Sequence, residues 1–477
     1  MVVSVVMGTS SWCDCAGLVS QAQTGGRSVS KGSGITRGDR RRNARKARLR
    51  ALVPQENAVL GLDLGEKRQA LTVAGADGQV LARRSPQVSV HDLGPCLGWA
   101  LEQARVAGYA GLSVACEPTG SRWMAVQDLC AVRSLPFVCV QPLVSHVARE
   151  QEDLTGDKTD EGDSALIARL ARELHCYEPE YLEGAWAELR DEGRRRAQLI
   201  TSATAAKQLI RDKLGLVAPA LLESACEPFD SPTWLASLEV VLERCGGDVA
   251  KAAVMGYEAF AAATAAVLPG WGGRRVGGTC RQLLAALGDG RGVARMRRAA
   301  LRRARGALAD LKYARSRRAQ AETDMIALLG ELGVDADRIC EIPGLSPATL
   351  AAILAETGDL NKYESSSSVV KHAGMSPARN ESGSFRGQAK ISRRGRPVLR
   401  LAAWRATWPV LRHCGVLAAK HAALTGRADD SRLTAEQARV ACAASLLRWI
   451  WSLTVHGTRW DARIAAGELG HHHAMAA

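Results

Sequence analysis

The sequence predicts an α/β sheet domain at residues 56–178, a helical region at 179–332 and a mainly helical C-terminal domain at 333–460. Three observations carry this prediction. Short apolar runs alternate with helical patterns in the first region, as in a sheet that is covered by helices. Ala, Leu, Arg and Glu then dominate two long stretches that are almost free of proline. From residue 339 onward, turns with Gly and Pro separate further helical segments.

The composition indicates a globular protein with an acidic partner. Of the 477 residues, 47% are hydrophobic, which is enough for at least one large core and excludes a wholly disordered chain. Lys and Arg (63) outnumber Asp and Glu (49), and the net charge of +14 indicates a polyanion such as nucleic acid. A basic surface that is merely well solvated is the alternative explanation.

Neither a membrane partner nor a secretory route is expected. There is no stretch of ~18 uncharged apolar residues, which a membrane-spanning helix requires. The N-terminus lacks the basic segment that opens a secretory signal, so we expect a cytoplasmic location. The 13 cysteines form no CxxC pairs, which favours buried reduced thiols over a zinc site.

Residues 1–55 are predicted to be a basic tail, and residues 461–477 a second tail. Residues 40–48 hold six cations in nine positions, and like charges at this density oppose packing. The first tail is therefore predicted to be disordered, or else to serve as an electrostatic arm for nucleic acid.

The α/β domain opens with the apolar run VLGLDLG at residues 59–65, which has the pattern of a buried strand with one acid, Asp63. Residues 69–74 and 79–82 are predicted strands on either side of a hairpin turn at 76–78.

The rest of this domain alternates helix and strand. Apolar residues between 93 and 104 recur at helical spacing, and a strand at 112–116 ends in the turn that contains Glu117. A helix at 123–133 then leads to a strand at 137–140. This alternation is typical of an α/β sheet.

The middle of the chain is predicted to contain two long helices, at residues 186–222 and 293–332. Long amphipathic helices of this kind pair with each other or with a second subunit, as in a coiled coil. Residues 232–290 between them contain several helix breakers and are predicted to form a looser helical insertion.

The segment PGLSP at residues 343–347 lies between two helical segments, with Ser346 as N-cap and Pro347 as the first residue of the second helix. A glycine turn before a helix N-terminus presents backbone N–H groups that can bind phosphate. The segment is therefore similar to a helix-hairpin-helix, which binds the DNA backbone, and an ordinary helical hairpin is the alternative.

Four acids stand out in the α/β domain. Asp63 lies within a strand, Glu117 lies at a strand end, and Asp160 and Asp163 are three residues apart near a helix start. Acids from such positions can converge on two hard cations, which clamp the attacking and leaving oxygens of a phosphodiester. Singly, Asp160 and Asp163 are also explained by a helix cap and Glu117 by a turn, whereas Asp63 has the stronger claim to a function because an unpaired carboxylate in an apolar strand is costly. Four further acids compete nearby: Glu152, Asp153, Asp157 and Glu161.

A second group of residues follows the segment AGMSP at residues 373–377. Ser382 precedes a glycine in a loop that is crowded with cations, namely Arg379, Arg386, Lys390, Arg393, Arg394, Arg396 and Arg400. Arginines bind phosphate in pairs of hydrogen bonds, so this loop is predicted to bind nucleic acid. A serine nucleophile for phosphoryl transfer and a solvated loop are the alternatives.

Together these motifs resemble the Piv-type insertion-sequence transposases, the one-ten family. The resemblance rests on GLDLG, CEPTG, KTDEGD, PGLSP, AGMSP, ESG and ISRRG in this order, and it covers roughly residues 57–455. It implies a RuvC-like (RNase H-like) domain with a mixed sheet, a helical coiled-coil region and a mainly α transposase domain. It also implies that Asp63, Glu117, Asp160 and Asp163 form a DEDD tetrad that binds Mg²⁺, and that Ser382 is the nucleophile.

The resemblance further implies a DNA transposase or site-specific recombinase that forms a covalent serine–DNA intermediate. Members are similar in using a structured guide RNA, the bridge RNA, and in acting as homo-oligomers, so a dimer or tetramer is expected. The alternative function is a RuvC-like structure-specific endonuclease that uses metal-activated water. A nucleic-acid-binding scaffold with a degenerate site is the non-enzymatic alternative.

Overall fold

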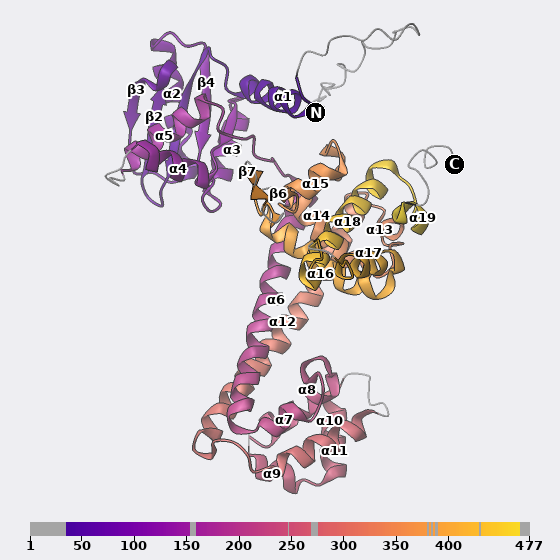
Figure 1. The fold of residues 1–477 in the computed structure, drawn as a ribbon. Helices are drawn as coiled ribbons and strands as arrows, with labels where there is room; N and C mark the ends of the chain where they lie inside the picture. Colours follow the sequence, from indigo (N-terminus) through magenta and orange to yellow (C-terminus); the bar gives the residue numbers. More distant parts are fainter. Residues whose placement is uncertain are drawn as a thin grey trace, which may run out of the picture. The chain divides into compact units, whose positions relative to one another are not determined.

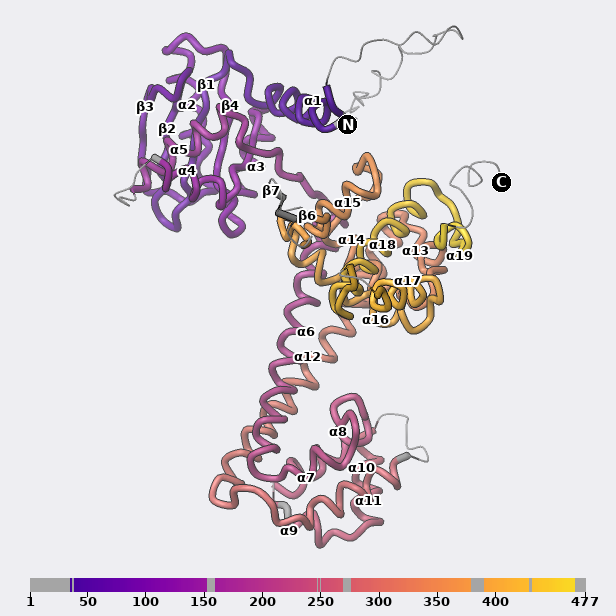
Figure 2. Tube along the Cα trace, in the orientation of Figure 1, coloured from indigo at the N-terminus to yellow at the C-terminus, as the bar shows by residue number. Residues whose placement is uncertain are grey.

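The computed structural model describes residues 35–152, 159–246, 248–268, 275–378, 381–382, 385–386, 390–428 and 431–467. The chain divides into two compact units, Met1–Tyr181 and Leu182–Ala477. Figure 1 shows the helices and strands of each unit, and Figure 2 follows the same path along the Cα atoms.

Unit 1 contains a mixed five-stranded sheet with the order β3-β2-β1-β4-β5. Its strands are β1 (Asn57–Leu64), β2 (Gln69–Ala74), β3 (Val80–Arg84), β4 (Gly111–Cys116) and β5 (Phe137–Cys139). The first three strands are antiparallel neighbours, whereas β4 is parallel to both β1 and β5. The predicted α/β domain and each of its predicted strands are therefore confirmed.

The predicted hairpin between β2 and β3 is also present. Its turn contains Asp77 at φ 55° and Gly78 at φ 78°. Two successive residues with positive φ match the right-handed twist of the strands that they connect, and Asp-Gly is a favoured pair for this turn.

Helices cover both faces of the sheet. They are α1 (Arg37–Leu52), α2 (Gly94–Val106), α3 (Arg122–Val132), α4 (Pro142–Glu152) and α5 (Asp160–Arg172). Leu60 and Leu62 of β1 pack in one core with residues of α2 and α3, whereas Val59 packs in a second core with residues of α1 and α5. Alternate residues of β1 thus contribute to opposite cores, as the twofold repeat of a strand requires.

The prediction of a disordered tail up to residue 55 is wrong for residues 37–52, which form α1. Thr36 and Asp39 form a capping box at its start, and Leu49 and Val53 are buried against the sheet. Cations continue along the helix as far as Arg50, but residues 40–48 are exposed, so Leu49 and Val53 can pack on the sheet while the charged side chains stay in solvent. Residues 1–34 lie outside the described residues.

Unit 2 is built on two long helices, α6 (Gly184–Val217) and α12 (Arg297–Glu331), which pack side by side as predicted (Figure 1). The predicted first helix is shorter than 186–222 because the chain breaks before Pro219 and continues as α7 (Pro219–Glu223). The insertion between them is helical, as predicted: α8 (Pro232–Glu239), a π-helical turn at Val240–Arg244, α9 (Val249–Val254), α10 (Tyr257–Val267) and α11 (Arg275–Leu287).

Two separate cores lie at opposite ends of the long helix pair. The insertion packs against Ile210 and Leu214 of α6 and Leu308 of α12. The C-terminal helices pack against Leu189 of α6 and Met325 of α12. The helix pair is thus anchored at both ends by apolar burial, the main stabilising term in folding.

The C-terminal part of unit 2 is mainly helical, as predicted. Its helices are α13 (Ala336–Ile339), α14 (Pro347–Thr357), α15 (Ser366–His372), α16 (Pro397–His413), α17 (Gly415–Thr425), α18 (Ala435–His456) and α19 (Ala462–Ala466). Four two-residue strands lie between α15 and α16: β6 (Pro377–Ala378), β7 (Glu381–Ser382), β8 (Phe385–Arg386) and β9 (Lys390–Ile391).

The PGLSP turn has the predicted cap. Ser346 is the N-cap of α14, its hydroxyl accepts a hydrogen bond from the Thr349 N–H, and Pro347 opens the helix. The turn itself is covered, because a Cβ on Gly344 would lie 2.6 Å from the carbonyl oxygen of Pro409 in α16. An ordinary helical hairpin packed on α16 therefore describes this segment better than an open phosphate-binding turn.

Among the described residues, no helix is long and apolar enough to cross a membrane.

Candidate active site

Asp63 lies near the carboxyl end of β1, on the face of the sheet that α5 covers. Alternation along the strand places it on the same face as Gly61. A Cβ on Gly61 would lie 2.0 Å from the carbonyl oxygen of Ser164 and 2.9 Å from the Cβ of Ala168, so only glycine admits α5 this closely. The close packing at Gly61 brings the first turns of α5 next to Asp63.

Glu117 follows β4 at the same edge of the sheet. The two strands are parallel, and their register pairs Leu62 with Cys116. The next residues along each strand are Asp63 and Glu117, which are therefore neighbours where the strands end. Carboxyl ends of parallel strands are a common place for functional groups in α/β sheets.

The helix start that was predicted around Asp160 and Asp163 is confirmed. The hydroxyl of Thr159 accepts a hydrogen bond from the Gly162 N–H at 3.1 Å and caps α5. Asp163 is buried, with 7% of its surface exposed, whereas Asp160 is exposed.

A cavity of about 220 Å³ brings three of the four predicted acids together. Its lining residues are Asp63, Glu117, Thr119, Pro142, Ser145, His146, Arg149, Asp163 and Ile167. Asp160 is not among them, although it lies in the same helical turn as Asp163. The competing acid Glu161 is exposed and also absent from the lining, and Asp153 and Asp157 lie outside the described residues.

Two side chains of α4 contact the acids in this cavity. The Ser145 hydroxyl donates a hydrogen bond to Oε2 of Glu117 at 2.6 Å. The Arg149 guanidinium donates from Nε to Oδ1 of Asp163 at 2.8 Å, and its second nitrogen lies 2.7 Å from the same oxygen. The acids are thus held in place by side chains that come from a different element.

The cavity also contains four residues of α4 that the sequence motifs did not identify as part of the site. Pro142, Ser145, His146 and Arg149 recur at the spacing i, i+3, i+4 and i+7, which places them on one face of a helix. The signal is weak because this face is polar, whereas helices are normally recognised by an apolar face. Helix α4 begins directly after β5, beside the carboxyl ends of the strands, so its polar face lines the cavity.

The donor chemistry of the cavity suits a hard divalent cation, since Mg²⁺ prefers carboxylate oxygens. In this arrangement the side chains do not form a ligand cluster. Within the described part of the chain, no group of three or more His, Cys, Asp or Glu side chains is close enough to hold a metal ion. Asp163 is paired with Arg149, so this contact competes with any other cation for the carboxylate.

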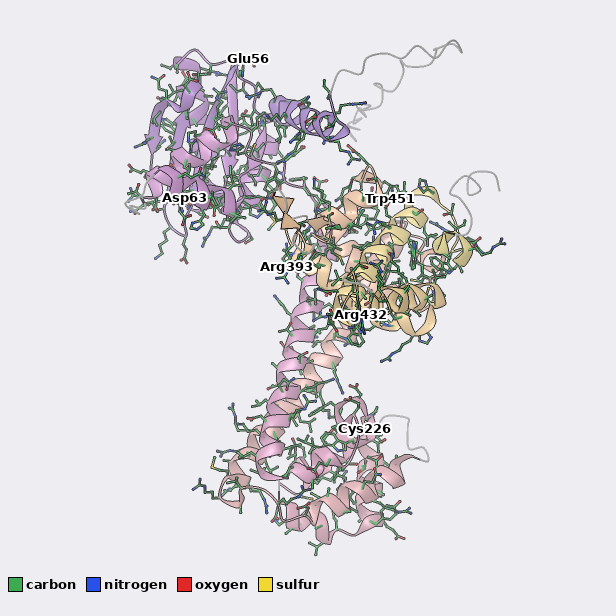
Figure 3. The ribbon with its side chains drawn as sticks, in the orientation of Figure 1. Glu56, Asp63, Cys226, Arg393, Arg432 and Trp451 are labelled. Atoms are coloured by element: carbon green, nitrogen blue, oxygen red, sulfur yellow. The ribbon has the colours of Figure 1, made fainter. Side chains whose placement is uncertain are left out.

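Ser382 lies in a small hairpin, in which β7 pairs with β8 and Ser382 is opposite Phe385. Its backbone is described, but its side chain and that of Arg386 are outside the described part of the structure, as is all of Arg379. The hairpin belongs to unit 2, whereas the acid cavity belongs to unit 1. In Figure 3, Asp63 is labelled in the first unit and Arg393 in the second.

Two glycines close the base of the segment that contains this hairpin. A Cβ on Gly395 would lie 2.3 Å from the backbone nitrogen of Gly374, whose φ of 68° also favours glycine. Backbone hydrogen bonds from Ser392 to Ser376 and from Arg393 to Gly374, each of 2.9 Å, continue the closure. The two ends of the segment that contains Ser382 are therefore held against each other, next to the helices that flank it.

The cations that were predicted to bind nucleic acid divide into two groups. Lys390, Arg393 and Arg394 are exposed, in keeping with contacts to phosphate. Arg400 instead donates a hydrogen bond to the carbonyl oxygen of Ala373 at 2.9 Å. Arg396 donates to the carbonyl oxygen of Glu356 at 2.9 Å and forms an ion pair with its carboxylate at 3.2 Å. Arg396 and Arg400 therefore have roles inside the protein.

The Arg396 contacts belong to a cluster at the C-terminus of α14. Arg190 of α6 donates to the carbonyl oxygen of Ala355 at 2.9 Å, and the Tyr363 hydroxyl donates to that of Thr357 at 2.9 Å. These groups satisfy carbonyl groups that the helix end leaves without intrahelical partners. The cluster links α6, α14 and the start of α16, next to the base of the Ser382 segment.

Burial and positive charge shift two pKa values in this cluster. Burial, followed by the charges of Arg396, Lys362 and Arg190, lowers the pKa of His372 to about 4. Burial, followed by the charge of Arg396, lowers the pKa of Lys362 to about 8. Burial is the larger cause of both shifts, and the neighbouring cations, of which Arg396 pairs with the buried carboxylate of Glu356, add to it.

Two family profiles match this chain. Residues 60–219 match the DEDD transposase domain of the IS110 type, which includes the acid cavity. Residues 336–422 match the profile described as "Transposase IS116/IS110/IS902 family", which includes the segment around Ser382. Together the two matches span more than half of the chain. No curated protein matches it.

Proposed function

The chain belongs to the IS110 family of transposases and is an enzyme that acts on DNA, and from this premise we propose how its two sites divide the reaction. Asp63, Glu117, Asp160 and Asp163 form the metal-binding tetrad, and Ser382 is the nucleophile. The observation that carries the proposal is the convergence of Asp63, Glu117 and Asp163, from three separate elements, on one cavity.

The acids are suited to hold divalent cations, and Mg²⁺ is the ion that we propose. When bound, such ions stabilise charge on the attacking and leaving oxygens of a phosphodiester. Ser145 orients Glu117 through its hydrogen bond, and Arg149 holds Asp163 until that ion pair opens. Asp160 lies in the same first turn of α5 as Asp163, three residues before it, and joins the tetrad through a rearrangement of this turn.

Ser382 is proposed to attack the phosphorus of a DNA phosphodiester through its hydroxyl oxygen. A Ser–O–P bond forms as the bond to one sugar oxygen breaks, the serine proton leaves to a base, and the leaving oxygen gains a proton. The reverse reaction with another DNA hydroxyl rejoins a strand and restores the serine. The exposed Lys390, Arg393 and Arg394 near the base of the segment support this role, because cations stabilise the charge of phosphate.

The partners and the setting of the reaction are part of the proposal. DNA at the element ends and at the target is the substrate, and a structured guide RNA, the bridge RNA, selects the sites. A homo-oligomer, either a dimer or a tetramer, allows the acids of one copy to act with Ser382 of another. The net charge of +14 supports binding of two nucleic acids. The reaction is placed in the cytoplasm.

The test is a search for a covalent protein–DNA adduct on denaturing gels. The substrate is a plasmid with the native element ends, incubated with Mg²⁺ and transcripts of the flanking non-coding DNA. Wild type, Ser382→Ala and the matched control Ser376→Ala are compared. The proposal predicts an adduct for wild type and Ser376→Ala and none for Ser382→Ala. Cleavage without an adduct, equal in all three proteins, would instead identify a nuclease that uses metal-activated water.

A further inference from the structure

A second hollow lies in the C-terminal part of unit 2, between α17, α18 and α19. Its volume is about 470 Å³, within the range of roughly 300–1,000 Å³ that is typical of ligand pockets. Its lining residues are Val416, Ala419, Lys420, Ala423, Ser445, Arg448, Trp449, Ala465 and Ala466. Unlike the acid cavity of unit 1, it contains two cations and no acid.

The shape of the hollow follows from the spacing of small residues. Val416, Ala419, Lys420 and Ala423 have the spacing i, i+3, i+4 and i+7 and so share one face of α17. Four short alanine side chains, two on α17 and two on α19, leave the space open, and Trp449 of α18 adds a flat aromatic wall. Lys420 therefore lies among apolar side chains, and its ammonium group contacts the hydroxyl of Ser445.

The two cations of the hollow have no carboxylate partner among the described residues. Lys420 donates a hydrogen bond to the hydroxyl of the buried Ser445 at 2.5 Å. Burial lowers the pKa of Lys420, the thiol of Cys442 raises it by a smaller amount, and the charge of Arg448 lowers it further. Burial also lowers the pKa of Arg448. Two like charges in one partly buried hollow are unfavourable, and an anion between them relieves both effects.

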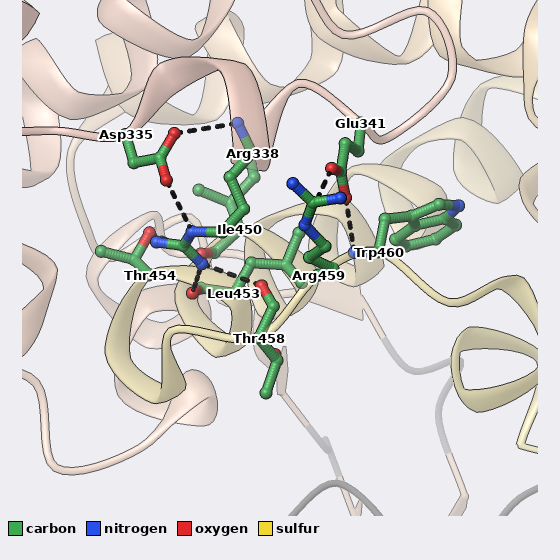
Figure 4. A network of polar contacts seen from close by, with 9 residues as sticks. All are labelled: Asp335, Arg338, Glu341, Ile450, Leu453, Thr454, Thr458, Arg459 and Trp460. Atoms are coloured by element: carbon green, nitrogen blue, oxygen red, sulfur yellow. Dashed lines mark hydrogen bonds and ion pairs between the residues drawn. The ribbon is translucent and has the colours of Figure 1, made fainter. Parts of the chain in front are cut away.

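A network of polar contacts joins the C-terminal end of α18 to α13 and Glu341 (Figure 4). The Trp449 ring packs edge-to-face on Trp460, with centroids 4.9 Å apart, and the backbone N–H of Trp460 donates to Oε2 of Glu341 at 3.2 Å. Arg338 donates to the carbonyl oxygens of Leu453 and Thr458 at 2.6 and 2.8 Å. These contacts connect the end of α18, the helix that carries Trp449, to α13.

We propose that this hollow binds a nucleotide of a nucleic-acid strand, with its phosphate on Lys420 and Arg448 and its sugar or base along Trp449 and the alanines. A strand is favoured over a free nucleotide because the protein acts on DNA and because Lys420 is accessible from solvent. Aromatic stacking together with a phosphate contact is the usual way in which proteins hold single strands. The site lies apart from the Ser382 segment and does not depend on its chemistry.

The test measures binding of a short fluorescent oligo-dT strand to the full chain by anisotropy, as a function of salt. Lys420→Gln combined with Arg448→Gln is compared with Arg305→Gln combined with Lys312→Gln, which removes the same charge. In the control, both cations are already paired with acids, Arg305 with Glu243 at 2.9 Å and Lys312 with Glu239 at 2.6 Å. We expect the hollow variant to bind at least about tenfold more weakly than the control, since hydrogen bonds to a charged group are lost.

A second variant tests the hollow without changing its charge. Ala423→Phe fills the space from an exposed position of α17 and should weaken strand binding while the melting temperature stays unchanged. Lys420→Gln alone serves if the double variant fails to fold. Equal binding by the hollow and control variants would overturn the site. Displacement of the strand by micromolar AMP would overturn the assignment to a strand and identify a free-nucleotide site.

Discussion

The Arg149 guanidinium lies 2.7 Å from Oδ1 of Asp163, inside the cavity that Asp63 and Glu117 also line. A cation of the protein thus occupies one carboxylate of the proposed metal site. A metal ion that binds Asp163 must first displace Arg149, and this displacement costs free energy. Arg149 therefore lowers the metal affinity of the site, in addition to orienting Asp163.

Replacing Arg149 should therefore change metal binding. We expect Arg149→Gln to raise the apparent affinity for Mg²⁺ or Mn²⁺ about tenfold, because a charge-assisted contact no longer competes for Asp163. Isothermal titration calorimetry of the full chain measures this. The control is Arg169→Gln, which breaks an i,i+4 pair with Glu173 on the same helix. Equal affinities in both variants would show that Arg149 does not compete.

The Glu356 carboxylate is predicted to stabilise the C-terminal core. It is buried and paired with Arg396, so Glu356→Gln leaves guanidinium groups without their compensating charge. We expect the free energy of unfolding to fall by roughly 3 kcal/mol, the lower end for a broken buried pair, because Arg396 retains some access to solvent. Urea unfolding measures this, with the exposed Glu331→Gln as control. A loss of stability no larger than in the control would contradict the role.

His372 should make stability depend on pH. Its pKa is about 4 in the folded chain, below the ordinary value of 6.5, so the unfolded chain binds more protons between these pH values. Stability is therefore full above about pH 6.5 and falls as the pH drops towards 4. Unfolding of His372→Gln should be less dependent on pH over this window than that of wild type. The exposed His91→Gln is the control, and a slope in His372→Gln equal to that of wild type would exclude His372 as the cause.

Much of the fold could be predicted from local patterns. The strand at Asp63, the β2–β3 hairpin, the cap of Ser346 and the helix start at Thr159 each depend on a few neighbouring residues. The residue pattern allowed the four acids to converge, and the family resemblance implied that they do; three of them line one cavity, because two follow parallel strands and the third begins the helix that packs on Gly61.

The remaining features depend on distant parts of the chain. The contact of Arg149 with Asp163 and that of Arg396 with Glu356 join different elements, and nothing in the local sequence distinguishes these arginines from exposed ones. Helix α1 was missed because its basic stretch conceals the apolar end that packs on the sheet. Trp408 is 43% exposed, and its ring centroid lies 3.7 Å from the Arg439 guanidinium, a contact between α16 and α18 that no local pattern indicates.

The most direct measurement is DNA cleavage and strand exchange by Asp63→Asn beside Glu161→Gln, with the element-end plasmid, guide transcripts and Mg²⁺. Both variants remove one negative charge from unit 1, but only Asp63 lines the cavity, and Glu161 is exposed. We predict that Asp63→Asn lowers the rate of cleavage and strand exchange at least about a hundredfold, equivalent to ~2.7 kcal/mol of transition-state stabilisation. Glu161→Gln should keep a rate near that of wild type. Comparable activity in both variants, with both proteins folded, would contradict an active site in this cavity.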